Sequence, residues 1–182
     1  PGAGQALQLE AAEAAAEVDA DVAYIDPPYN QHSYMGNYHV WESLVRWDKP
    51  ETYGIANKRI GCKAYKSDFN SKRRIRDGLR EVFAAIRAKH LLVSFNNEGY
   101  VGRDEMVELL SEKGHVGFVA VDFKRYVGAQ IGIHNLRGEK VGQVSHLRNK
   151  EYLFVVSARV ADVEAVVGAL TESLGTAALA SG

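Results

Sequence analysis

The sequence has a single cysteine, Cys62, and no long apolar run. One cysteine excludes an internal disulfide and a cysteine-based zinc site, and none of the six histidines stands in an H-E-x-x-H spacing, so we expect no metal site. No segment approaches the roughly 18 to 20 apolar residues of a membrane span, and the N-terminus lacks a secretory signal, so we expect a cytoplasmic protein without membrane contact. With 46% apolar and 25% charged residues, the composition predicts one globular domain over residues 1–182, with a flexible tail at about 175–182.

The net charge of −1 conceals a segregation of sign along the chain. Nine basic and two acidic residues lie between Lys58 and Arg80, and six basic and one acidic residue lie between Lys124 and Lys150. The remainder of the chain is therefore acidic. Such segregation can present one basic face to a polyanion, but it is also typical of a solvated loop that leads into a helix. Charge alone leaves both interpretations open.

Apolar periodicity predicts helices that alternate with short strands. The clearest helix carries Ile75, Leu79, Val82, Phe83 and Ile86 on one face. Other helices are expected at 5–17, from about Asp104, and over 163–174. A further helix is expected after Asn37, which would cap it, with Tyr38, Trp41, Leu44 and Val45 on one face. Strands are expected at 21–25, which should be buried, and at 90–95, 116–121 and 152–156, with antiparallel hairpins around Ile131 and Val141–Leu147. The alternation predicts an α/β fold whose mainly parallel sheet is covered by helices on both faces.

The sequence Asp26-Pro27-Pro28-Tyr29 directly follows the first predicted strand. Open α/β sheets bind their ligands at the carboxyl ends of strands. Two prolines fix φ and remove two backbone donors, so the turn offers carbonyl oxygens beside the Asp26 carboxylate and no competing N–H. Such acceptors suit an exocyclic amino group, and Tyr29 supplies a face on which its ring could stack. The alternative is a plain strand-ending turn with Tyr29 packed on the core.

The residues after this turn are rich in aromatic and amide side chains where a core would contain aliphatic ones. They include Asn30, Tyr34, Asn37, Tyr38 and His39. Groups that stack on a base or bind its edge are what a pocket for an extruded base requires. His39 taken alone is better explained as an ordinary helix residue than as a catalyst.

Together these motifs resemble the Dam-like adenine-specific DNA methyltransferases, particularly those of restriction-modification systems. The resemblance runs from about Asp19 to Val156, and D-P-P-Y joined to N-Y-H-x-x-E at this distance is specific. It rests on the segments Tyr24–Tyr34, Asn37–Glu42, Trp47–Pro50, Gly54–Arg59, Leu91–Asn96, Ser145–Arg148 and Glu151-Tyr152.

The resemblance implies a partial Rossmann-like, S-adenosylmethionine-dependent methyltransferase fold with an antiparallel C-terminal hairpin. It also implies methyl transfer from S-adenosylmethionine to the 6-amino group of a flipped adenine. Asp26 and Pro27 would accept hydrogen bonds from the amino group, and Asp26 would also lie next to the cofactor. Pro28 would stiffen the turn, and Tyr29 would stack on the base. The residues implied to shape the pocket are Asn30, Tyr34, Asn37, Tyr38 and His39. A basic insertion at about 54–76 would face double-stranded DNA and hold its phosphates through Lys58, Arg59, Lys72, Arg73 and Arg74.

The sequence departs from the family in the cofactor loop. Family members carry F-x-G-x-G after a first strand, whereas the only comparable feature here is Pro1-Gly-Ala-Gly4, with no strand before it. We therefore expect the C-terminal portion of such an enzyme, which needs the missing N-terminal segment or associates through an exposed edge of the 22–25 strand. The alternatives are an RNA base or glutamine amide methyltransferase, and a catalytically silent DNA-binding or interaction fragment.

Overall fold

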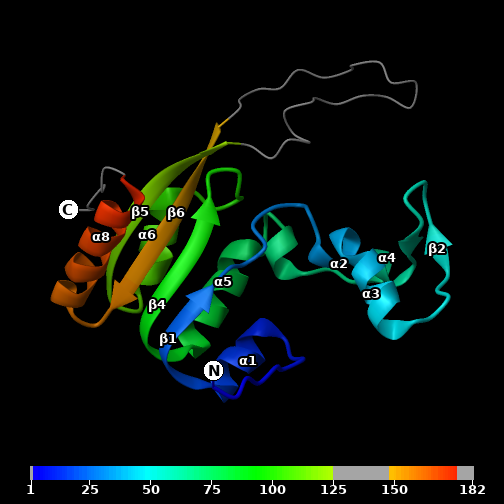
Figure 1. Cartoon of the computed structure of the whole chain (residues 1–182), viewed down its shortest axis with the longest axis horizontal. Coiled ribbons are helices and arrows are strands. Elements are labelled where there is room, and N and C mark those ends of the chain that lie inside the picture. The colour runs from blue at the N-terminus through cyan, green and yellow to red at the C-terminus, as the bar shows by residue number, and fades with distance from the viewer. Residues whose placement is uncertain (1, 125–147, 176–182) are drawn as a thin grey trace. The chain divides into compact units, whose positions relative to one another are not determined.

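The computed structural model describes residues 2–124 and 148–175 (Figure 1). The chain divides into two compact units. Unit 1 comprises Pro1–Val18, Pro27–Arg87 and Gly99–Val101, and unit 2 comprises Asp19–Asp26, Ala88–Glu98 and Gly102–Gly182. The hairpins predicted around Ile131 and Val141–Leu147, and the tail after residue 175, lie outside the described residues. Within the described ranges, no helix combines the length and the apolar character that crossing a bilayer requires.

Unit 2 is built on a sheet with the strand order β1-β4-β6-β5. Its strands are β1 (Asp19–Ile25), β4 (Arg87–Asn96), β5 (His115–Lys124) and β6 (Arg148–Ser157). β6 is antiparallel to both of its neighbours, and Val156 lies opposite Leu91 on one side and Val116 on the other. β1 and β4 run in the same direction (Figure 1). Since β4 and β5 are both antiparallel to β6, the strands β1, β4 and β5 all share one direction. The α/β class and the antiparallel C-terminal strand pair are confirmed.

Successive residues of a strand point to opposite sides, and α8 (Val160–Leu174) and α6 (Arg103–Ser111) pack on opposite faces of the part of the sheet that β5 and β6 form. α8 packs Val163 and Val167 against Val119 of β5 and Val155 of β6. On the opposite face, the ring of Phe118 lies 5.6 Å from the guanidinium of Arg103 at the start of α6.

Gly117 allows α8 to approach the sheet closely. A Cβ atom at this position would lie only 2.7 Å from Val163 Cγ1 and 2.9 Å from Val167 Cγ2. Any larger residue would push the helix away, so the close packing depends on this glycine.

The expectation of a buried first strand is wrong. No residue of β1 is buried, and Val22 and Tyr24 are 52% and 61% exposed. The reason is position, because β1 is the edge strand of the sheet that the described residues form, where its neighbour is β4. Its apolar residues predicted the strand correctly, but they do not show whether other elements pack on it.

The regular structure among the described residues of unit 1 consists of short helices and one β-hairpin, joined by loops. Its elements are α1 (Ala11–Glu17), α2 (Tyr34–Asn37), α3 (His39–Arg46), β2 (Thr52–Tyr53), β3 (Lys58–Arg59), α4 (Gly61–Ala64), the 3-10 helix η1 (Asp68–Asn70) and α5 (Ile75–Ala85). The periodicity of α5 is confirmed, since Ile75, Leu79, Val82 and Phe83 are all buried. α1 packs against α5.

Two details of unit 1 differ from the sequence predictions. Asn37 does not cap a helix but ends α2, whose N-terminus is capped by the Ser33 hydroxyl, which accepts a hydrogen bond from the Gly36 N–H at 3.4 Å. The segment 54–76 is not simply a loop, because β3, α4 and η1 lie in it. The hairpin forms because Gly54 and Asn57, with φ of 68° and 47°, supply the left-handed conformations of its turn.

α3 turns its apolar side chains toward solvent. Trp41, Leu44 and Val45 are 61%, 50% and 85% exposed, whereas Ser43 faces β3 and accepts a hydrogen bond from Arg59. The predicted apolar face exists, but in this structure it is not packed on a core.

Candidate active site

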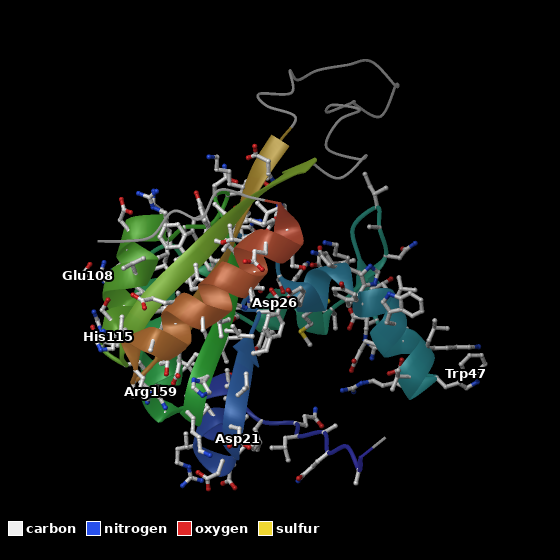
Figure 2. All side chains as sticks on the ribbon, turned by 60° about the vertical axis from the view of Figure 1, so that its left-hand side comes forward. Asp21, Asp26, Trp47, Glu108, His115 and Arg159 are labelled. Atoms are coloured by element: carbon white, nitrogen blue, oxygen red, sulfur yellow. The ribbon has the colours of Figure 1, made fainter. Side chains whose placement is uncertain are left out.

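Asp26 directly follows the C-terminal end of β1 (Figure 2), and a hydroxyl group orients its carboxylate. The Ser94 hydroxyl on β4 donates to Asp26 Oδ1 at 2.8 Å, and the Tyr24 hydroxyl donates to Ser94 Oγ at 3.0 Å. Asp26 is exposed, and its hydrogen bond from Ser94 leaves the second carboxylate oxygen available as an acceptor. An oriented carboxylate at a strand end is therefore present where the sequence predicted one.

The two prolines continue the chain into unit 1 with trans peptide bonds. Pro27 is buried, and Pro28 and Tyr29 are half-buried. The Tyr29 carbonyl accepts a hydrogen bond from the Tyr100 N–H at 2.8 Å. Asn30 uses its side-chain oxygen within the next turn, where it accepts from the His32 N–H at 3.0 Å.

A separate group of predicted residues lines a cleft of about 590 Å³ in unit 1. The rings of Tyr34 and Tyr38 lie 5.8 Å apart at 59°. The cleft is lined by Tyr34, Met35, Tyr38, His39, Glu42, Arg46, Pro50, Arg59, Ile60, Gly61 and Cys62. The structure thus brings Tyr34, Tyr38 and His39 together, whereas Asn37 and the diproline turn do not line this cleft.

The basic residues predicted to hold phosphates have different surroundings. Arg59 is bound internally, because it makes a two-pronged ion pair with Asp48 at 2.5 and 2.6 Å and donates to Ser43 Oγ at 3.0 Å. Its side chain is only 13% exposed. The hydrogen bond from Arg59 also holds the pKa of Asp48 below its ordinary value. This pairing ties α3, the 47–50 segment and β3 together.

The other basic side chains are more accessible. Lys58 reaches toward α2, since its ammonium nitrogen lies 3.6 Å from where a Cβ of Gly36 would be. Arg74 pairs with Asp68 at 2.8 Å. Lys72 and Arg73 are exposed, and no hydrogen bond or ion pair joins them to another residue that the structure describes.

Three residues of this site were given no role from the sequence, although Ser94 lies in the segment Leu91–Asn96 on which the resemblance partly rests. Ser94 orients Asp26, and Tyr100 and Asn70 bind the loop after Tyr29. Ser94 could have been noticed as a polar residue inside an apolar strand, but the other two are joined to the loop only by the fold. Among the described residues, no group of three or more histidine, cysteine, aspartate or glutamate side chains is arranged to hold a metal ion.

Glu151 on β6 carries a perturbed carboxyl group near Asp26. Burial raises its pKa above the ordinary 4.5, the charges of Asp26 and Glu98 add to this, and a hydrogen bond from Asn96 opposes it. The folded state therefore favours protonation, so stability from this group is present below pH 4.5 and is lost as the pH rises through the raised pKa.

We expect Glu151→Gln to stabilise the protein near pH 8 by up to about 1 kcal/mol, because the group is only partly buried and solvent screens its charge. The amide removes the buried charge but keeps an oxygen for Asn96. Thermal unfolding of both proteins near pH 8 and near pH 4 measures the effect, and the gain should vanish at the lower pH. An equal gain at both values would show that the charge is not its cause.

Comparison with known proteins places this chain in a family. Residues 3–108 match the model of the D12 class N6 adenine-specific DNA methyltransferases. The chain is 33% identical over 123 residues to modification methylase LlaI of Lactococcus lactis subsp. lactis, covering 68% of this chain and 20% of that protein. It is 31% identical over 125 residues to modification methylase StsI of Streptococcus sanguinis, covering 67% of this chain and 19% of that protein.

The chain aligns with a larger part of a third relative, at lower identity. The type II methyltransferase M.NlaIII of Neisseria lactamica is 23% identical over 149 residues, which is 81% of this chain and 43% of that protein. No solved structure matches. The chain spans about a fifth of the length of the LlaI and StsI methylases that it matches. Because more than half of its residues fit the family model, the chain belongs to the D12 class N6 adenine-specific DNA methyltransferase family.

Proposed function

We propose that the protein transfers a methyl group from S-adenosylmethionine to the 6-amino group of an adenine flipped out of double-stranded DNA, with units 1 and 2 acting as one catalytic domain. The observation that carries this proposal is the Asp26 carboxylate, which Ser94 orients at the end of β1 directly before Pro27 and Pro28. The relatives LlaI and StsI are named as modification methylases, which supports a role in a restriction-modification system.

The chemistry required of the site is activation of a weak nucleophile. The lone pair of an adenine amino group is delocalised into the ring. Hydrogen bonds from its two N–H groups to the Asp26 carboxylate and the Pro27 carbonyl favour the pyramidal form, in which that lone pair can attack. Tyr29, half-buried beside the prolines, would stack on the flipped base and hold it in place.

The residues present fit one side of a cofactor site. When bound, S-adenosylmethionine supplies an electrophilic methyl group. Asp26, exposed at the carboxyl end of β1, is the residue that we assign beside it. The sequence contains no F-x-G-x-G loop, so we assign no other cofactor contact to this chain.

Product analysis tests the proposal directly. The full-length protein is incubated with labelled S-adenosylmethionine and double-stranded DNA, and the DNA is digested to nucleosides. We expect label in N6-methyladenine. Label on cytosine, on RNA alone or on a glutamine side chain would replace the proposed substrate. DNA binding without any transfer would instead favour a silent binding protein.

Lys72 and Arg73 are our first choice for phosphate contacts, because neither is paired within the described chain, whereas Arg59 would have to leave Asp48. Changing both to alanine should weaken binding to DNA of any sequence and reduce the slope of log affinity against log salt by about 2. Fluorescence anisotropy at several salt concentrations measures this.

The matched control for this change is Arg159→Ala, which removes an exposed basic charge from unit 2 at the start of α8. This variant should keep the wild-type slope. An unchanged slope in the Lys72 and Arg73 double variant would show that these side chains do not contact phosphates.

A further inference from the structure

The loop that follows the diproline turn is fixed by a side chain from far along the sequence. Asn70 is the last residue of η1, and its amide nitrogen donates to the Asn30 carbonyl at 2.7 Å and to the His32 carbonyl at 3.2 Å. Both N–H groups of this amide are therefore used on one loop. All of these residues lie in unit 1.

Tyr100 holds the same loop through two further bonds. Its backbone N–H donates to the Tyr29 carbonyl at 2.8 Å, and its hydroxyl donates to Gln31 Oε1 at 3.2 Å. Each residue from Tyr29 to His32 is thus bound through a carbonyl or a side-chain oxygen. A loop with several external hydrogen bonds has few alternative conformations, which is what orienting the Tyr29 ring requires.

We propose that Asn70 is a positioning residue for the methyl transfer, which holds the Tyr29–His32 loop in the conformation that receives the base. This inference rests on the proposed function. Asn70 also stands two and three residues before Lys72 and Arg73, the side chains that we assign to phosphates. The short connection places the loop that holds the base beside the segment that holds the backbone of the same DNA.

The proposed positioning role belongs to the side-chain amide of Asn70 and not to the helix η1 as a whole. Ser67, the residue before η1, makes no side-chain capping bond, so the helix does not depend on side-chain hydrogen bonds at its start. An aspartate at position 70 would keep the shape but place a negative oxygen against two carbonyls. An alanine would leave both carbonyls without their donor.

The test compares Asn70→Ala and Asn70→Asp with the matched control Ser67→Ala in the full-length protein. We expect kcat for methylation to fall about tenfold or more in both Asn70 variants. The dissociation constant for DNA and its salt slope should stay within twofold of wild type, because Asn70 contacts no phosphate in this assignment. Ser67→Ala should behave as wild type.

A double variant separates positioning from general destabilisation. If Asn70 acts through Tyr29, then Tyr29→Ala with Asn70→Ala should be about as slow as Tyr29→Ala alone, because interactions within one unit are not additive. Losses that multiply, or an Asn70→Ala variant with wild-type kcat, would overturn the inference.

Hydrogen exchange measures the conformational stability of the Tyr29–His32 loop independently of catalysis. The His32 amide, which is bonded to Asn30 Oδ1, should exchange faster in Asn70→Ala than in wild type or in Ser67→Ala. If the wild-type protein does not methylate adenine, the proposed function fails, while faster exchange would still support the loop clamp. Unchanged exchange together with wild-type kcat would reject the clamp and leave the proposed function standing.

Discussion

Asp26→Ala is expected to lower the rate of adenine methylation about 100- to 1000-fold, the loss typical of removing one oriented group that stabilises a transition state. The variant removes the carboxylate that Ser94 orients and with it an acceptor for the adenine N–H. Single-turnover methylation at saturating DNA and cofactor measures the chemical step. DNA affinity should change little, because phosphate contacts supply most of it.

The matched control for this prediction is Asp21→Ala on β1, the strand that Asp26 follows. Asp21 and Asp26 lie toward opposite ends of β1 (Figure 2), and Asp21 is an exposed residue paired with Lys89 at 2.6 Å. Losing this surface ion pair should leave the methylation rate unchanged. If Asp26→Ala methylated as fast as this control, Asp26 would have no role in activating the amino group.

Tyr29→Ala should lower methylation about 10- to 100-fold, since stacking of a base on an aromatic side chain contributes about 1–3 kcal/mol. Tyr29→Phe keeps the ring face and should retain most of the rate. Fluorescence of 2-aminopurine at the target position measures how well the flipped base is stacked. The alanine variant should show a brighter base, because its stacking partner is gone.

Tyr65→Ala serves as the control, because it removes an exposed tyrosine from the same unit without touching the turn. Its methylation rate and base fluorescence should match those of the wild type. A Tyr29→Ala variant with normal methylation would show that the Tyr29 ring only packs on the core, which is the alternative interpretation of this turn.

The parts of the fold that the sequence predicted are those set by local periodicity. The apolar spacing in α5 predicts the helix and its buried face with Leu79 and Val82, and the apolar run in β4 identifies it as a strand. Burial of β1 could not be read in the same way. A residue such as Val22 has the same local pattern at the edge of a sheet as at its centre.

The sequence predicted the part of the candidate site whose functional groups are adjacent in the chain. The Asp26–Tyr29 motif places a carboxylate, rigid carbonyls and a ring within four positions. The contacts of Ser94 with Asp26 and of Asn70 with Asn30 were not predicted, because the fold alone joins these residues across 68 and 40 positions of the sequence. The assignment of Arg59 to phosphates followed charge, whereas its pairing with Asp48 depends on how the hairpin folds back on α3.

The exposed apolar side of α3 provides the protein with an optical probe. Trp41 and Trp47 are the only tryptophans in the sequence, and they are 61% and 85% exposed on and just after this helix. Intrinsic emission excited at the indole band therefore reports on this part of unit 1 alone, and it should be red-shifted and readily quenched by iodide or acrylamide. Any molecule that covers α3, whether DNA, protein or a second copy of the chain, would shift the emission to the blue and shield it from the quencher without a label having been added.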